Sequence, residues 1–307
     1  MDNRKAIDPE LQKSAQSFPF NRAVVAMGNL YLGASWRRIK APEGVREEEL
    51  EIRGCRGLPF QTSVFTPAGT GKARPALLYV HGGAFVYKAA AYQKRLAFLY
   101  AEQAECRVFF PHYHLAPKYR YPATYEDVLS LCRYMTEHAE ELGIDPQRIG
   151  IAGDSAGASV AALVCCRWEE EKIGMPCLQM LAYPVTDADM STASMKRFTD
   201  TPKWNSRANE RMWKYYCGED RERRKQASPM QVPLSAGIPP AYIETAEFDC
   251  LHDEGVLFAE KLKEAGADVV LNETRGTFHG YDDMLDARIV KGNIERRTSF
   301  LRERFGV

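Results

Sequence analysis

The chain has 307 residues, enough for one large domain or for a core domain with a small accessory one. Lys and Arg together number 41, as do Asp and Glu, so no overall charge favours nucleic acid or an anionic membrane as a partner. The first residues lack the apolar run of a signal peptide, and no stretch approaches the ~18 apolar residues of a membrane span. We therefore expect a soluble, cytoplasmic protein, and the oligomeric state stays open.

The eight cysteines form no C-x-x-C pair, and several lie in apolar runs such as VCCRW. In a chain of this length without a secretion signal, such cysteines are typical of small buried residues in a reducing compartment. We expect no disulfide framework.

Two regions differ from the rest of the chain. Residues 1–45 carry helical patterning without a strand, and residues 186–235 are polar and dense in Trp, Tyr and charged residues. The second region is too long for an ordinary connection, and its aromatic content argues against the alternative of a disordered loop. We predict that both regions form a helical cap over the active site, above a catalytic core of residues 46–185 and 236–307.

From residue 74 onward, short β-rich runs alternate with longer helical patterns. This alternation predicts an α/β fold with a parallel sheet and crossover helices on both faces. Apolar runs such as ALLYV fit strands that are buried on both sides. The runs with strand character are RPALLYV, RVFFPHY, RIGIAG, CLQMLAYP, PAYIETAEFD and DVVLNET.

The segment HGGAF, His81 to Phe85, directly follows the first of these runs. Its glycines let bare backbone approach a substrate oxygen, as an oxyanion hole requires; one such donor is worth roughly 3 to 4 kcal/mol in a measured case. We expect the amides of Gly82 and Gly83 to be donors. HGG alone is a weak signal, so its position relative to other motifs matters.

The segment HYHLAPK places His112 and His114 two residues apart, which could allow them to share a metal ion. No H-x-x-x-H or H-E-x-x-H pattern is nearby to complete such a site. We therefore expect neither a metal nor a cofactor.

The segment GDSAG, residues 153–157, stands where a strand turns into a helix. It fits the G-x-S-x-G elbow, in which a strained turn exposes a nucleophilic serine at the top of a sheet. A Cβ atom at Gly153 or Gly157 would crowd the neighbouring strand and helix. A chance match in a surface turn is the alternative. We interpret Ser155 as the nucleophile and the amide of Ala156 as a further oxyanion donor.

A nucleophilic serine needs a histidine base, and in this type of fold the order is Ser, then Asp or Glu, then His. Only two histidines follow Ser155. We favour His279, which follows a strand at the edge of the sheet where sites collect, whereas His252 begins an expected helix. For the carboxylate we favour Asp249, at the end of a strand, over Asp253, which is better placed to cap or support the helix.

Together these motifs resemble the hormone-sensitive-lipase-like family of α/β-hydrolases, in its bacterial branch of carboxylesterases and acetyl esterases. The resemblance covers nearly the whole chain and rests on HGGAF, HLAPKYRYPATYEDV, GDSAG, YPVTD, ASPMQVPLSAGIPPAYIETAEFDCLHDEG and FHGY. It implies an α/β-hydrolase fold with a mostly parallel, twisted sheet of about eight strands and a helical cap. It also implies a triad of Ser155, Asp249 and His279, and that His81 braces the oxyanion loop.

One departure from the family lies at His112, His114 and Lys118, where Asp, Arg and Glu are common. The family's Asp and Arg lie two apart on one strand face, and we expect this chain to lack the ion pair they would make. The triad is unaffected, but the shape and charge behind the oxyanion loop are left open.

The function that the resemblance implies is hydrolysis of short-chain acyl esters, including acetyl esters, through an acyl-enzyme. An amidase, peptidase or formamidase could use the same triad. A non-catalytic small-molecule receptor on this fold is a third reading, but such a receptor would need a damaged triad.

Overall fold

A computed structural model describes residues 6–69 and 73–307 of the chain. Eight strands form one sheet in the order β1-β2-β4-β3-β5-β6-β7-β8. The pairs β1/β2 and β2/β4 are antiparallel, and all other neighbours are parallel. The strands are β1 (Val45–Arg53), β2 (Pro59–Pro67), β3 (Arg74–Val80), β4 (Arg107–Pro111), β5 (Ile144–Asp154), β6 (Gln179–Ala182), β7 (Ala241–Phe248) and β8 (Val269–Phe278). The expected fold class, a mostly parallel sheet of about eight strands, is confirmed.

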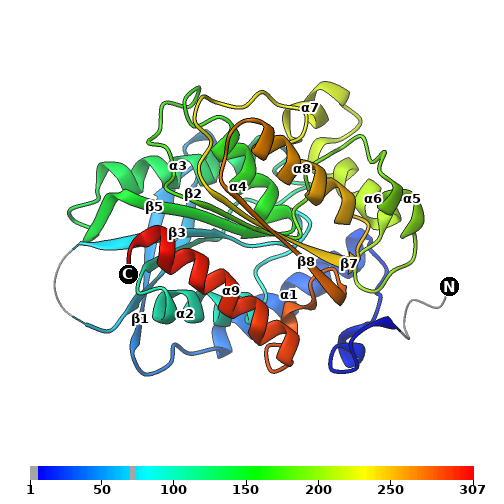
Figure 1. The fold of residues 1–307 in the computed structure, drawn as a ribbon, viewed down its shortest axis with the longest axis horizontal. Helices are drawn as coiled ribbons and strands as arrows, with labels where there is room; N and C mark the ends of the chain where they lie inside the picture. Colours follow the sequence, from blue (N-terminus) through cyan, green and yellow to red (C-terminus); the bar gives the residue numbers. More distant parts are fainter. Residues whose placement is uncertain (1–5, 70–72) are drawn as a thin grey trace.

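Helices cover both faces of this sheet (Figure 1). One face carries α3, α4 and α8, and the other carries α2 and α9. Their bounds are α1 (Arg22–Arg38), α2 (Ala91–Gln103), α3 (Ala123–Glu137), α4 (Ala156–Cys166), α5 (Ala193–Arg197), α6 (Ser206–Cys217), α7 (Arg221–Gln226), α8 (His252–Glu264) and α9 (Arg288–Phe305), with short 3-10 helices at Gln12–Ser14, Cys55–Gly57 and Tyr281–Asp283.

The core lies along the central strands and the helix that follows the serine. Six of the seven residues of β3 are buried, and every residue of α4 is buried. An apolar helix with no polar face must be covered all round, which fits α4 between α3 and the sheet. The eight cysteines are free thiols, and all but Cys177 are buried, as their apolar surroundings predicted.

The sequence analysis did not identify β1 and β2. In β1, charged residues occupy most positions, and the strand lies at the edge of the sheet. Edge strands commonly carry charge because it opposes pairing with other chains. The apolar periodicity that indicates a buried strand is therefore absent from β1.

The two segments expected to form a cap lie against each other. Residues 12–38 contain a 3-10 helix and α1, while residues 186–235 contain α5, α6 and α7. The Lys203 amide donates to the Gln16 carbonyl at 3.0 Å, and the Phe20 ring packs edge-on against Trp204. Residues 1–5 of the expected cap lie outside the described residues. The division of the chain into core and cap stays a prediction.

Candidate active site

Ser155 lies at the sharp turn between β5 and α4, with φ 53° and ψ −120°. A non-glycine residue rarely adopts this conformation, which is costly and typical of functional sites. A Cβ atom on Gly153 would lie 2.5 Å from the Gly157 carbonyl carbon, and one on Gly157 would lie 2.0 Å from the Val80 carbonyl oxygen. The predicted steric need for glycine at both positions is confirmed.

The structure brings Ser155, His279 and Asp249 together from three separate elements. His279 directly follows β8, and Asp249 directly follows β7. The Ser155 Oγ atom lies 2.8 Å from His279 Nε2, and His279 Nδ1 lies 2.6 Å from Asp249 Oδ2. All three residues are buried. This is the hydrogen-bond chain by which a base activates a hydroxyl and a carboxylate orients the base.

The rejected candidates lie elsewhere. His252 Nδ1 bonds Asp253 Oδ1 at 2.9 Å, and the same ring faces Glu273 at 3.3 Å. Asp253 stands in the first turn of α8, as expected, and its Oδ2 atom accepts the amide of Ser194 at 2.7 Å. Asp253 therefore links α8 to the first turn of α5, a connection that the sequence did not reveal.

The loop after β3 brings HGGAF beside the serine. Gly83 has φ 117°, which favours glycine, and its carbonyl accepts the amides of Val86 and Tyr87 in a tight turn. Among the backbone hydrogen bonds of turns, loops and caps in the described ranges, none is donated by Gly83 or Ala156. Both amides are thus available to a substrate oxygen, and their role in an oxyanion hole stays a prediction, as does that of Gly82.

Asp154, next to Ser155, was not identified as a site residue from the sequence. Its carboxylate accepts hydrogen bonds from the Tyr79 hydroxyl at 3.0 Å and from the Gln93 amide at 2.8 Å. Burial raises the pKa of Asp154 to about 6, although hydrogen bonds from Gln93, the Gly82 backbone and Tyr79 act to lower it. Asp154 therefore ties the turn that carries Ser155 to β3 through Tyr79 and to α2 through Gln93.

His81 is buried below this loop, and its Nδ1 atom lies 2.6 Å from the Gly82 carbonyl oxygen. Its ring stacks on Tyr113, with centroids 4.3 Å apart. Burial lowers the pKa of His81 to about 3, so the ring is neutral at physiological pH. This position suits a residue that braces the loop.

The two histidines of HYHLAPK bond different partners beyond the end of β4. His112 Nε2 lies 3.0 Å from the Ser63 hydroxyl, and His114 Nδ1 lies 2.8 Å from Asp127. The Lys118 ammonium lies over the Tyr119 ring. Within residues 6–69 and 73–307, no group of three or more His, Cys, Asp or Glu side chains is placed to hold a metal ion.

A cavity of about 650 Å³ opens over Ser155 and His279. One wall comes from the two segments expected to form the cap, and much of its lining is aromatic. Trp204 lies beside the His279 ring, with centroids 6.0 Å apart. Two other aromatic residues of the 186–235 region, Trp213 and Tyr216, are fully buried instead, and Tyr216 stacks on Phe85. The cap-segment residues along the cavity are Lys13, Ser14, Gln16, Phe18, Phe20, Val24, Tyr31, Leu32, Lys203 and Trp204.

The loop after His279 also bonds side chains of the expected cap segments that line the cavity. Asp283 accepts the Ser14 hydroxyl at 2.6 Å and pairs with the Lys203 ammonium at 2.7 Å. Lys203 donates as well to the Gly280 carbonyl at 2.7 Å. Both segments of the expected cap therefore contact the loop that carries the histidine.

The chain is similar to known proteins in both sequence and structure. The family described as alpha/beta hydrolase fold matches residues 77–283. The chain is 33% identical to esterase LipI of Mycobacterium tuberculosis, over 91% of this chain and 89% of that protein. It is 31% identical to ethyl acetate hydrolase of Pseudomonas putida, over 78% and 76% of the two chains.

Among solved structures, one titled bacterial heroin esterase is similar with a TM-score of 0.91 and 31% identity, covering 98% of each chain. Within residues 6–69 and 73–307, no helix combines the length and the apolar composition needed to cross a membrane.

Proposed function

The chain belongs to the hormone-sensitive-lipase-like family of alpha/beta hydrolases, and on this premise we propose that it is a serine carboxylesterase for short-chain acyl esters. Carboxylesterase activity follows from the family and from relatives named as esterases. The observation that supports the catalytic assignment is the continuous hydrogen-bond chain from Ser155 through His279 to Asp249.

In the proposed mechanism, the Ser155 oxygen attacks the ester carbonyl carbon while His279 Nε2 takes the hydroxyl proton. Asp249 holds the Nδ1–H of the imidazole and stabilises the imidazolium that forms. The Gly82, Gly83 and Ala156 amides stabilise the oxyanion of the tetrahedral intermediate. When the intermediate collapses, the C–O bond to the alcohol breaks and the imidazolium protonates the leaving alcohol. Water then hydrolyses the acyl-enzyme by the same steps.

A short acyl group is supported by the names of relatives, which include an ethyl acetate hydrolase and an acetyl esterase. In an enclosed apolar site each methylene that fits adds about 0.8 kcal/mol, whereas overpacking costs about 1 to 3 kcal/mol. We expect kcat/KM to rise from acetyl toward butyryl esters and then fall sharply. Much of the cavity would then accommodate the alcohol part of the ester.

The alternative of an amidase, peptidase or formamidase uses the same triad but must position and protonate a leaving amine. Hydrolysis of an ester and an anilide with the same acyl group separates the two. A non-catalytic receptor is disfavoured because Ser155, His279 and Asp249 stand in hydrogen-bond contact.

The proposed partner is a small ester, as expected for a carboxylesterase. The balanced charge favours neither nucleic acid nor an anionic membrane. A cytoplasmic location is supported by the free cysteines, seven of which are buried thiols.

The decisive experiment compares the parent protein with Ser155→Ala. The parent should hydrolyse p-nitrophenyl acetate and butyrate and react with a fluorophosphonate probe, while Ser155→Ala should do neither and keep the parent's melting temperature. Labelling of Ser155→Ala at the parent's rate would remove this serine from the mechanism. A series from acetate to palmitate tests the acyl preference, and kcat/KM still rising at octanoate would refute it.

A further inference from the structure

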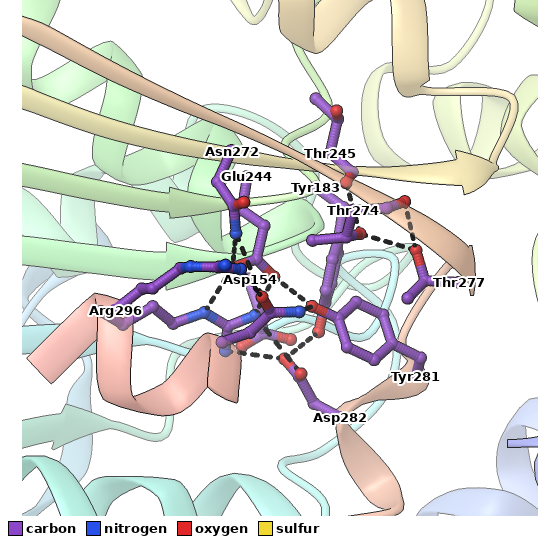
Figure 2. Close-up of polar contacts among 12 residues, drawn as sticks. Asp154, Tyr183, Glu244, Thr245, Asn272, Thr274, Thr277, Tyr281, Asp282 and Arg296 are labelled. Carbon is purple, nitrogen blue, oxygen red and sulfur yellow. Dashed lines mark hydrogen bonds and ion pairs between the residues drawn. The ribbon is translucent and has the colours of Figure 1, made fainter. Parts of the chain in front are cut away.

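A cluster of buried charged and phenolic groups joins β7, α9 and the loop after His279 (Figure 2). One of its members, Tyr183, also lines the cavity. Arg297 of α9 donates from Nη1 to Asp282 Oδ2 at 2.9 Å and from Nε to Glu244 Oε2 at 3.1 Å. The three charged side chains are at most 1% exposed. The cluster also contains Tyr100, Tyr183, Tyr242, Tyr281, Asn272 and Asn293.

Asp282 has a second partner besides the guanidinium. The Tyr183 hydroxyl donates to Asp282 Oδ2 at 2.8 Å, and Figure 2 shows this side chain reaching toward the carboxylate. Tyr183 follows β6, is fully buried, and has φ 37°. Its amide donates to the Glu244 carbonyl at 2.6 Å. Such a conformation persists only where surrounding contacts hold it.

The Tyr183 ring meets the imidazole of His279 edge to face, with centroids 4.9 Å apart and planes at 64°. The hydrogen bonds to Ser155 and Asp249 fix the two ring nitrogens of His279. The ring could still tilt about the line that joins those nitrogens. The rings of Tyr183 and Trp204 both lie beside the imidazole, and their contact with it limits this tilt.

Stability alone gives no reason for Asp282 in this cluster. Glu244 already supplies both carboxylate oxygens to Arg297. A second buried carboxylate adds desolvation and repulsion that one guanidinium compensates only in part. In agreement, burial and the nearby Glu244 charge raise the pKa of Asp282 despite the Arg297 pairing. What Asp282 adds to the Arg297–Glu244 pair is an acceptor for the Tyr183 hydroxyl.

We propose that Asp282 is a positioning residue for the catalytic histidine. Held by Arg297, it fixes the Tyr183 hydroxyl, and the Tyr183 ring in turn fixes the tilt of the His279 imidazole. This inference rests on the proposed function for the identity of the base. It assigns a role to a carboxylate that touches no substrate.

The test compares Tyr183→Phe, Asp282→Asn and the double variant in kcat and KM. A misplacement of 1 Å can cost about a hundredfold in rate, so partial loosening should lower kcat about tenfold in each single variant. KM should change less than twofold. Tyr183→Phe removes the donor of the Tyr183–Asp282 hydrogen bond, and Asp282→Asn replaces its charged acceptor by a weaker neutral one. Because both changes act on this one hydrogen bond, the double variant should lose little more than Tyr183→Phe alone.

Tyr242→Phe is the matched control. The Tyr242 hydroxyl donates to Glu244 Oε2 at 3.0 Å in the same cluster, but its ring packs against Phe300 rather than His279. Both substitutions remove one buried hydroxyl from a carboxylate that keeps Arg297. Tyr242→Phe should lower the melting temperature as Tyr183→Phe does and leave kcat within twofold of the parent.

A second readout does not depend on ester hydrolysis. The proton NMR resonance of His279 Nδ1–H, assigned by its loss in His279→Gln, should broaden or shift in Tyr183→Phe and stay unchanged in Tyr242→Phe. Equal effects of these two variants, an unchanged kcat in Tyr183→Phe, or additive losses in the double variant would overturn the proposal. If Asp282→Asn fails to fold, the two tyrosine variants decide. An inactive parent with the expected NMR changes would contradict the esterase function alone.

Discussion

Carboxylates around His279 form an inner set and an outer set that differ in burial and in partners. The inner set is Asp249, Glu244 and Asp282, whose side chains are at most 1% exposed. The outer set is Asp253 and Asp283, whose side chains are 33% and 35% exposed. Inner carboxylates bond the histidine and a buried arginine, where desolvation makes each partner costly to remove.

The outer carboxylates bond the segments expected to form the cap. Asp253 accepts the Ser194 amide, and Asp283 bonds both Ser14 and Lys203. Asp282 and Asp283 are adjacent in sequence and face opposite environments. Burial, more than position in the sequence, therefore separates the groups proposed to govern chemistry and stability from the groups that contact the segments expected to form the cap. Four substitutions test this separation.

Asp249→Asn, in the inner set, should have the largest effect. The amide keeps the shape of the carboxylate but favours the wrong tautomer of His279, a change that costs about ten-thousandfold in kcat in a serine protease triad. The expected loss appears in steady-state kinetics with a short-chain ester. Asp253→Asn serves as the control, and a larger loss there than in Asp249→Asn would exchange the roles of the two carboxylates.

Arg297→Met should give the next largest effect, on stability. The change leaves Glu244 and Asp282 buried without their cation, which costs about 3 to 5 kcal/mol in unfolding free energy. Urea denaturation measures this loss. Arg302→Met, on the same helix, removes a part-exposed pair with Glu105 and should cost no more than about 1 kcal/mol. Equal losses of unfolding free energy in the two variants would show that the buried Arg297 pairs stabilise the fold no more than the part-exposed Arg302 pair.

The candidate active site and the buried Arg297 cluster differ in what the sequence could reveal. Gly153, Ser155 and Gly157 form a local motif, and His279 and Asp249 follow from chain order and strand ends, so these positions could be predicted. By contrast, Arg297 lies in IERRTSFLRERF, where it has the same appearance as its exposed neighbours.

Contacts between distant residues account for what the sequence did not reveal. Asp282 meets Tyr183, 99 residues away, and Ser14 meets Asp283, 269 residues away. No local pattern encodes such pairs. The charged strand β1 was missed for a different reason, because its residues follow the needs of a solvent-facing edge rather than those of a core.

Asp253→Asn should have a small effect that depends on pH. Burial acts to raise the pKa of Asp253, but hydrogen bonds from His252 and the Ser194 amide outweigh it and lower the pKa below its usual value. A carboxylate of this kind stabilises the fold above its unfolded pKa, and the contribution is lost as pH falls through the folded pKa. The variant should lose about 1 kcal/mol at pH 7.

Urea denaturation at several pH values tests this sign. The difference between the parent and Asp253→Asn should shrink toward zero as the pH falls below the folded pKa. A difference that instead grows on acidification would mean that the Asp253 carboxylate is destabilising in the folded protein, contrary to its contacts with Ser194 and His252.

Asp283→Asn should have the smallest effect, and it acts on the cap contact rather than on the chemistry. The Asp283 and Lys203 side chains are 35% and 23% exposed, so the pair contributes less than about 1 kcal/mol and is screened by salt. We expect kcat within about twofold of the parent, because Lys203 keeps its bond to the Gly280 carbonyl. KM should rise about twofold to fivefold at low salt, a change of about 0.4 to 1 kcal/mol.

Ser14→Ala is the matched variant, since it removes the other partner of Asp283 without changing any charge. Its effect on KM should be independent of salt, whereas that of Asp283→Asn should fade between about 0.05 and 0.5 M NaCl as the Debye length shortens. A tenfold fall in kcat for Asp283→Asn with KM unchanged would place this outer carboxylate with the inner ones. The cap contact at the histidine loop would then govern the reaction itself, because loosening the loop would disturb His279 as much as removing its support from Asp282.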